Sequence, residues 1–286
     1  MKPPASITVF TRRSPGGGPG EGLRRLIELA GEAGVTVRVP PDEVAKHDVQ
    51  GGPGVELDVE LDGPTDLALA LGGDGTILAA MRAYAGRDVP VFAINFGAVG
   101  FLATIERDQL DDGIRRALRG DFEVLRLPAL ELRTPRGSWV AVNDVSFHRR
   151  QDLRVAELGY SVLGEQVGEV RCDGLVLATP AGSTGYNLAN GGPVLAWGVE
   201  GYVVSFIAPH TLTARALVVA PEDALQVVNK SGVDPVDVTT DGRLVCSLDP
   251  REEVEVRFRH DVATLAQVDG ASFYHRLRDK FGRLTR

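Results

Sequence analysis

The sequence contains little cysteine and no long apolar stretch. Its 286 residues include two cysteines, Cys172 and Cys246, whereas a secreted scaffold built on disulfides needs more. No apolar run approaches the roughly 20 residues that a membrane-spanning helix requires. Two prolines and the pair Arg12–Arg13 leave no room for the apolar region of a signal peptide. We therefore expect a cytoplasmic protein in a reducing compartment, without a membrane partner.

Positive charge and histidine are also scarce. The net charge is −8 with an isoelectric point near 5.2, whereas a nucleic-acid binder usually carries a basic face, so nucleic acid is not the expected partner. The five histidines show no metal-ligand spacing, and we expect no metal site built by the protein alone. Apolar residues make up 43% of the chain, which is enough for a real core.

The first part of the chain alternates strand and helix patterns. Apolar or β-branched runs predict strands at 7–10, 35–39, 67–71 and 89–94, and helical spacing predicts helices at 23–30 and 77–84. The glycine- and proline-rich stretches 14–22 and 40–64 are expected to be loops, the second with a short strand at 55–61. A strand that is apolar throughout, such as 67–71, indicates a parallel sheet covered on both faces. We predict an open, Rossmann-like α/β domain at residues 1–122.

The second part has a different pattern. Short β-rich runs separated by turn residues recur at 140–147, 175–179, 202–207, 236–239 and 254–258. This spacing predicts an all-β sandwich domain at residues 123–269. A short helix is expected after Ser183, capped by Ser183 or Thr184. Helical spacing between 272 and 284 predicts a last helix, and segment 270–286 is expected to pack back on the first domain.

One glycine-rich turn combines a structural signal with a chemical one. Gly72-Gly73-Asp74-Gly75-Thr76 lies between a predicted strand and helix, where open α/β sheets bind their ligands. Glycine permits positive φ and close approach of a phosphate, and a helix N-terminus favours an anion. A carboxylate there would repel an anion unless it holds a metal or accepts a proton. The alternative is a plain turn with Asp74 or Thr76 as the helix N-cap.

A second glycine-rich stretch, 16–22, matches neither GxGxxG nor GxxxxGK[ST] and is predicted to be a flexible loop. Arg12 and Arg13 precede it and could contact a phosphate, although most surface arginines are only solvated.

The turn at Asp74 resembles one shared by NAD kinases, by diacylglycerol and sphingosine kinases and, more loosely, by phosphofructokinases. Three further runs are similar to NAD kinases in particular, and their order and spacing agree with that family over roughly residues 67–215. These runs are Asn95-Phe96-Gly97-Ala98-Val99-Gly100-Phe101-Leu102, then Val142-Asn143-Asp144-Val145, and a long signature with Asp173-Gly174-Leu175, Thr179-Pro180-Ala181-Gly182-Ser183-Thr184-Gly185-Tyr186 and Gly191-Gly192-Pro193.

The resemblance implies an enzyme that phosphorylates NAD at the 2′-hydroxyl of the adenosine ribose to give NADP. It implies ATP as the phosphoryl donor, with inorganic polyphosphate as an alternative in some bacterial members, and Mg²⁺ or another divalent cation. The fold of that family is an α/β domain followed by a β-sandwich. Its members form dimers or tetramers, so the resemblance implies a homodimer or homotetramer acting on small molecules.

By resemblance, Asp74 is the catalytic base that takes the proton from the sugar hydroxyl, and Gly75 lines the same site. Arg154 and Arg171 could hold pyrophosphate oxygens by paired hydrogen bonds. Asp173 could accept hydrogen bonds from a nicotinamide carboxamide, and Tyr186 could stack on a ring. The further positions that the resemblance assigns to substrate binding are Asn143, Asp144, Arg154, Arg171, Asp173, Thr184, Gly185, Tyr186, Asn187, Leu188 and Ala189.

The chain also departs from the pattern of the family. Two of these departures remove hydroxyl groups, and a third shortens an acidic side chain. The sequence therefore does not predict the contacts that these three positions make with the substrate. The departures are Asp144 for Glu, Gly185 for Ala, Ala181 for Thr, Ala189 for Ser and Arg243 for Gln.

Two other functions stay open. A diacylglycerol-type lipid kinase would share the Asp74 turn but is not expected to carry the run at 95–102 or the signature at 183–186, and binding to vesicles would favour it. A non-catalytic NAD(P) sensor would need no base, and NAD binding without phosphate transfer would favour that function.

Overall fold

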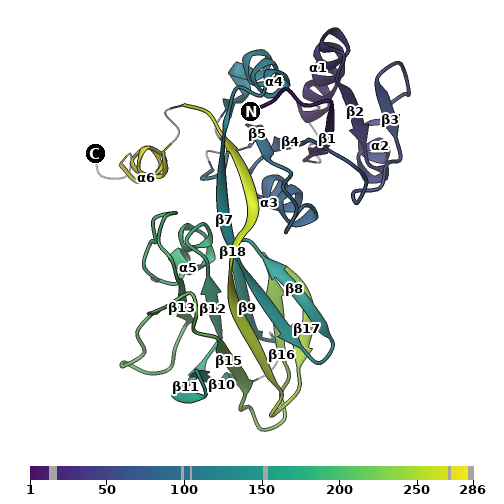
Figure 1. The fold of residues 1–286 in the computed structure, drawn as a ribbon. Helices are drawn as coiled ribbons and strands as arrows, with labels where there is room; N and C mark the ends of the chain where they lie inside the picture. Colours follow the sequence, from purple (N-terminus) through teal and green to yellow (C-terminus); the bar gives the residue numbers. More distant parts are fainter. Residues whose placement is uncertain (13–17, 98–99, 104, 151–153, 270–271, 283–286) are drawn as a thin grey trace. The chain divides into compact units, whose positions relative to one another are not determined.

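The computed structural model describes residues 1–12, 18–97, 100–103, 105–150, 154–269 and 272–282. The chain forms two compact units, Met1–Arg126 together with Ala263–Arg286, and Leu127–Val262 (Figure 1). The divisions fall inside two long strands, β7 (Glu123–Thr134) and β18 (Glu253–Gln267). The domain boundaries at residues 122 and 269 that the sequence suggests stay a prediction.

The first unit is built on a parallel sheet. Its strands are β1 (Ser6–Thr11), β2 (Thr36–Val39), β3 (Val55–Leu57), β4 (Leu67–Gly72) and β5 (Val91–Asn95). They are ordered β3-β2-β1-β4-β5, with parallel pairing throughout. The short strand β6 (Ile105–Glu106) and the end of β18 also pair with β5. The strand order reverses between β1 and β4, which is where open α/β sheets bind ligands.

Helices cover both faces of this sheet (Figure 1). In β4, alternate side chains point to opposite faces. Leu67, Leu69 and Leu71 join a core cluster with residues of α1 and α4, whereas Ala68 and Ala70 point to the opposite face of the sheet. None of the helices in the described ranges is long and apolar enough to span a bilayer. The helices are α1 (Gly18–Ala33), α2 (Pro41–His47), α3 (Asp74–Ala83), α4 (Leu110–Arg119) and α6 (Phe273–Phe281), with a 3₁₀ turn at Arg107–Gln109.

The second unit is a sandwich of two sheets with antiparallel pairing. One sheet has the order β11-β10-β15-β18-β7-β8, and the other has the order β14-β13-β12-β9-β16-β17. The strands not yet given are β8 (Gly137–Ala141), β9 (Asp144–Arg149), β10 (Ala156–Val162), β11 (Glu165–Cys172), β12 (Gly174–Ala178), β13 (Tyr202–Ile207), β14 (Leu217–Val219), β15 (Leu225–Asn229), β16 (Val236–Thr240) and β17 (Arg243–Leu248).

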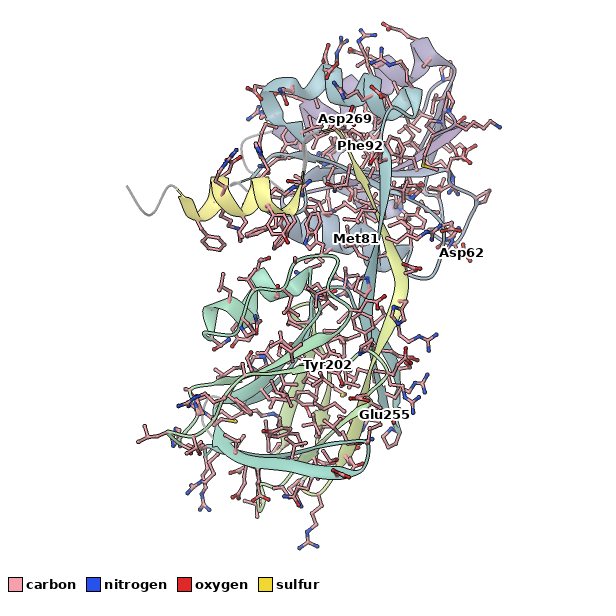
Figure 2. All side chains as sticks on the ribbon, turned by 60° about the vertical axis from the view of Figure 1, so that its left-hand side comes forward. Asp62, Met81, Phe92, Tyr202, Glu255 and Asp269 are labelled. Atoms are coloured by element: carbon pink, nitrogen blue, oxygen red, sulfur yellow. The ribbon has the colours of Figure 1, made fainter. Side chains whose placement is uncertain are left out.

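Alternate residues of each sheet point into the space between the sheets. Two large side chains among these, Phe147 on β9 and Tyr202 on β13, are fully buried. Figure 2 shows Tyr202 in the interior of this unit. On the other face of β12, Val176 and Ala178 pack with Leu195. The segment between β12 and β13, which contains the short helix α5 (Tyr186–Ala189), therefore covers the outer face of its sheet.

The predicted fold class, an open α/β domain followed by a β-sandwich, is confirmed. Two loop predictions in the first unit are wrong. Helix α1 begins at Gly18 and continues through Gly31, because its apolar stripe packs on the sheet and outweighs the low helix propensity of glycine. The loop expected at 40–64 contains α2, where Pro41 occupies the first helical turn and its missing N–H needs no partner. Residues 13–17 of the first predicted loop lie outside the described residues.

Two local predictions in the second unit are also wrong. The strand expected at 140–147 is interrupted between β8 and β9, where the backbone amides bond to a side chain from another part of the unit. The short helix expected after Ser183 is present as α5, preceded by a 3₁₀ turn at Gly182–Thr184, but the cap expected at Ser183 or Thr184 is wrong. Its N-cap is Gly185, because the hydroxyls of Ser183 and Thr184 donate to nearby carbonyl groups instead.

We expect Phe147→Ala to lower the free energy of unfolding by about 3–5 kcal/mol, because removal of a fully buried aromatic side chain leaves a cavity. Chemical denaturation followed by circular dichroism measures the change. Leu244→Ala, on the exposed side of β17, is the control and should change stability by less than about 0.5 kcal/mol. Equal effects of the two substitutions would contradict this assignment of the core.

Candidate active site

A cleft of about 520 Å³ opens in the first unit at the ends of β1 and β4, where the strand order reverses. Two cationic side chains line the cleft, Arg12 after the end of β1 and Lys280 on α6. Together with the N-terminus of α3, they favour an anionic ligand. Arg13 lies outside the described residues. The lining residues are Arg12, Gly73, Asp74, Gly75, Thr76, Gly97, Gly100 and Lys280.

The carboxylate of Asp74 is held at the first residue of α3. Its Oδ2 accepts a hydrogen bond from the backbone N–H of Phe101 at 2.9 Å, and its Oδ1 accepts one from Leu102 at 3.2 Å. Each oxygen keeps further lone pairs, so the group can still accept a proton. The N-cap of α3 is Gly73, so neither Asp74 nor Thr76 caps the helix. A plain capped turn therefore does not account for this carboxylate.

Two glycines near Asp74, Gly72 and Gly100, are needed for close packing. None of Gly72, Gly73 and Gly100 has a positive φ, so this turn does not use the backbone freedom that glycine permits. A Cβ on Gly100 would collide with Asp74 Oδ1, and a Cβ on Gly72 would collide with Thr76 Oγ1. A larger residue at either position would displace the carboxylate or the turn.

The run that begins at Asn95 forms another wall of the cleft. Asn95 is buried at the end of β5, where its Oδ1 accepts a hydrogen bond from the N–H of Gly97 at 2.9 Å. Its Nδ2 donates to Glu106 at 3.0 Å. These bonds fix the chain where it leaves the strand. Farther along the run, Phe101 and Leu102 are buried and direct their amides at the carboxylate.

Two cations of this site are missed by the sequence analysis. Lys280 lines the cleft, and its Nζ lies 4.4 Å from the centre of the Phe101 ring. Arg276, one turn earlier on α6, is buried and donates to the carbonyl of Phe101 and, at 2.7 Å, to Gln267. The amphipathic pattern of α6 carries no chemical signal, and both residues lie far from Asp74 in the sequence.

In the second unit, one carboxylate organises the motif that begins at Val142. Asp241 stands in a left-handed turn between β16 and β17, with φ of 46°. Its carboxylate accepts hydrogen bonds from the backbone N–H groups of Val142 at 3.1 Å, Asn143 at 2.7 Å and Asp144 at 3.1 Å. The three amides hold the start of β9 in place. The sequence indicates the turn at Asp241 but not this contact.

The long signature packs against the same motif. The carbonyl of Asn143 accepts a hydrogen bond from the N–H of Thr179 at 2.9 Å, and Thr179 Oγ1 donates to the carbonyl of Val142 at 2.7 Å. A Cβ on Gly182 would collide with the Asn143 carbonyl, so this position requires glycine. The two runs are therefore in direct contact within this unit.

Asn143 and Asp144 offer polar atoms in this cluster. Asn143 Oδ1 is buried and has no hydrogen-bond partner among the described residues. Asp144 is 6% exposed, and burial, followed by the charge of Asp241, raises the pKa of its carboxyl to about 7. A buried acceptor without a partner and a carboxyl with a raised pKa are typical of ligand-binding sites.

Side chains of α5 border the cluster. The ring of Tyr186 stacks on the imidazole of His148 with centres 5.7 Å apart and remains 38% exposed. Asn187 is fully buried, and its Nδ2 closes the loop by donating to the carbonyls of Ser183 at 2.8 Å and Pro193 at 2.9 Å. The other predicted residues of this segment are Thr184, Gly185, Leu188 and Ala189.

The remaining predicted residues border β10 and β11. Asp173, between β11 and β12, is half-buried and accepts a hydrogen bond from Arg149 Nε at 2.5 Å. Arg171 on β11 and Arg154 just before β10 are exposed. Their role in substrate binding stays a prediction.

An open α/β domain with a carboxylate in an anion-favouring cleft, followed by a β-sandwich, defines a class of two-domain kinases. The chain belongs to the ATP-NAD kinase family. The model of the N-terminal domain of that family matches residues 37–122, and the model of its C-terminal domain matches residues 142–267. The family reaction is the phosphorylation of NAD to NADP, so the chain is a kinase of this type.

Relatives agree with this assignment. The chain is 37% identical to the NAD kinase of Gemmatimonas aurantiaca over 77% of this chain and 78% of that protein. It is 32% identical to the NAD kinase of Carboxydothermus hydrogenoformans over 81% and 86%. An NAD kinase from Archaeoglobus fulgidus, solved in complex with ATP, is similar with a TM-score of 0.74 and 25% identity over 98% of both chains. Yeast NADH kinase complexed with NADH shares the fold, with a TM-score of 0.86 and 22% identity over 99% of this chain and 89% of that one.

Asp144→Asn is expected to remove part of the pH dependence of stability. Because the pKa of Asp144 is about 7 in the folded protein and about 3.9 in the unfolded chain, the folded state binds the proton more tightly. The free energy of unfolding should therefore fall as the pH rises from about 4 to about 7. Thermal unfolding between about pH 5 and about pH 8 should show a smaller fall for Asp144→Asn than for the wild type.

Asp249→Asn, at an exposed position after β17, is the matched control and should keep the wild-type profile. Parallel profiles for the wild type and Asp144→Asn would show that burial does not raise this pKa.

Proposed function

We propose that the chain transfers the terminal phosphoryl group of ATP to the 2′-hydroxyl of the adenosine ribose of NAD, with Asp74 as the general base. The observation that carries this proposal is a fixed carboxylate in an anion-favouring cleft. Two amide hydrogen bonds orient the carboxylate, and its remaining lone pairs can take a proton from a hydroxyl group.

In the proposed step, the ribose O–H bond breaks and its proton passes to Asp74. The ribose oxygen forms a bond to the terminal phosphorus of ATP, and the bond from that phosphorus to its bridging oxygen breaks, which releases ADP. Arg12, Lys280 and the N-terminus of α3 offset the charge of the phosphate oxygens. Gly75 lines the same cleft and has no side chain that would exclude a phosphate.

The relative from Archaeoglobus fulgidus, solved with ATP, supports ATP as the donor, and inorganic polyphosphate presents the same chemistry. Mg²⁺ or another divalent cation fits the cleft as a companion of these phosphates. In the described part of the chain, no three His, Cys, Asp or Glu side chains gather to hold a metal ion. Mg²⁺ is usually held by substrate phosphates, waters and one or two carboxylates. Asp74 is the carboxylate of the lining that would contact the ion, which would neutralise phosphate charge.

We propose that the cluster in the second unit binds NAD. Asn143 Oδ1 can accept a hydrogen bond from a donor of NAD, and the raised pKa of Asp144 lets its carboxyl donate or accept near neutral pH. The exposed part of Tyr186 offers a surface for stacking. Asp173 could accept hydrogen bonds from the nicotinamide carboxamide. The further contacts in this proposal are Arg154, Arg171, Thr184, Gly185, Asn187, Leu188 and Ala189.

Three other expectations remain proposals. They are a cytoplasmic location, a homodimer or homotetramer, and domain boundaries at residues 122 and 269. The scarcity of cysteine supports the first, the family resemblance supports the second, and the change of pattern along the chain supports the third.

Asp74→Asn should fold, keep much of its NAD affinity and lose about 10²- to 10⁴-fold in turnover, because an amide cannot act as the base. Purified protein with ATP, Mg²⁺ and NAD, coupled to an NADP-dependent dehydrogenase, gives kcat and KM. Asp62→Asn, on an exposed loop of the same unit (Figure 2), is the matched control and should keep wild-type turnover. Near-normal turnover of Asp74→Asn would remove Asp74 from the catalytic role.

Asn143→Ala should raise KM for NAD by about 5- to 10-fold with a smaller change in kcat, because the lost acceptor contributes to binding before and during the reaction. The same coupled assay measures both constants. Gln166→Ala removes an exposed amide from β11 and should leave both constants unchanged. An unchanged KM in Asn143→Ala would exclude this side chain from the NAD site.

A further inference from the structure

Arg276 carries a buried guanidinium group that the proposed reaction does not use. The residue stands in the first turn of α6 and is 7% exposed. Its Nη1 donates to the carbonyl of Phe101, and its Nη2 donates to Gln267 Oε1 at 2.7 Å. Burial disfavours the charged form and lowers the pKa of this guanidinium to about 10. Because a buried charge is costly, its place in the first unit calls for a specific role.

The hydrogen bonds of Arg276 lead directly to Asp74. The carbonyl of Phe101 and the N–H of Leu102 belong to one peptide group, which is planar and rigid. Arg276 bonds to the oxygen of this group, and Asp74 Oδ1 accepts from its nitrogen at 3.2 Å. The N–H of Phe101 donates to Asp74 Oδ2 at 2.9 Å. A charged donor on the carbonyl polarises the peptide and strengthens its N–H as a donor.

Anchoring of α6 does not by itself explain this arrangement. The helix already holds the same residue through other contacts, because Lys280 Nζ lies 4.4 Å from the centre of the Phe101 ring and the ring of Phe281 lies 5.9 Å from it. Arg276 adds to these a charged donor on the peptide that binds Asp74. The charge of Asp74 also opposes the effect of burial on the pKa of Arg276, so the two groups interact electrostatically.

We propose that Arg276 is a positioning residue for phosphoryl transfer, which holds the Asp74 carboxylate in its reactive orientation through the peptide group between Phe101 and Leu102. This inference rests on the proposed role of Asp74 as the base. Arg276 is not part of the cleft lining, so its loss should leave substrate binding intact. It should instead let the segment at 100–102, and with it the carboxylate, shift. A misplacement of about 1 Å costs roughly 10²-fold in rate.

Two variants of this chain test the inference, with Asp74→Asn assayed beside them. We expect Arg276→Met to lower kcat by about 10²-fold while KM for NAD and for ATP stays within about threefold. Arg276→Lys keeps one charged donor and should lose less. Added guanidinium ion should restore part of the kcat of Arg276→Met and leave that of Asp74→Asn unchanged, which a purely structural role of Arg276 does not predict.

Arg278→Met is the matched control, because it removes a largely exposed arginine from the same helix, and it should keep wild-type kcat. Thermal unfolding and NAD titration establish that each variant is folded. A fall in stability without a fall in kcat, or a rise in both KM values alone, would reduce Arg276 to an anchor of α6 and overturn the inference. If Arg276→Met does not fold, Arg276→Lys is compared with the wild type instead, and a rise in both KM values without any fall in kcat overturns it.

The parallel assay of Asp74→Asn distinguishes a failure of the proposed function from a failure of the positioning role of Arg276. Substantial turnover in Asp74→Asn would remove the proposed function. An inactive Asp74→Asn together with fully active Arg276 variants would leave that function intact and remove only the positioning role.

Discussion

The approach of two backbone amides to the carboxylate of Asp74 is the constraint on which the first unit depends. The amides of residues 101 and 102 reach the carboxylate because Gly100 has no side chain to occupy the same space. This requirement explains the glycine at position 100 in the run that follows β5. The buried Asn95 supports the same segment, because its amide fixes the chain where it leaves the strand. Packing around one carboxylate thus accounts for part of this sequence motif.

In the second unit, a carboxylate also accepts hydrogen bonds from backbone amides, and here it affects the pKa of a neighbouring carboxyl group. Asp241 accepts three backbone N–H groups, and these hydrogen bonds offset the cost of removing it from water. Asp144, close by, is buried, and its pKa rises to about 7. Ionised Asp144 therefore lowers stability at neutral pH. Such a group is characteristic of a functional site, and a ligand rich in hydrogen-bond donors, such as the ribose of NAD, would compensate it.

The sequence predicts those elements whose pattern is local. Strand β4 is apolar at every position but its last glycine, and β13 spans the predicted residues 202–207. The sequence cannot predict contacts that join distant segments, such as Asp241 with Val142 across 99 residues or Arg276 with Phe101 across 175. Neither contact leaves a local pattern, because an arginine on an amphipathic helix resembles a solvated charge and an Asp-Gly pair resembles an ordinary turn. Motifs therefore reveal residues that lie within short runs, such as Asp74 and Asn143, but not the distant residues that hold those runs in place.

The resemblance to the family pattern assigns a glutamate to position 144, where this chain has an aspartate. The usual glutamate is one methylene longer and could extend its carboxyl away from the strand. The shorter side chain keeps the carboxyl near the backbone of β9, where burial and the charge of Asp241 act on it together. In the proposed binding of NAD, the protonation state of Asp144 then matters near neutral pH as much as its hydrogen-bond geometry does.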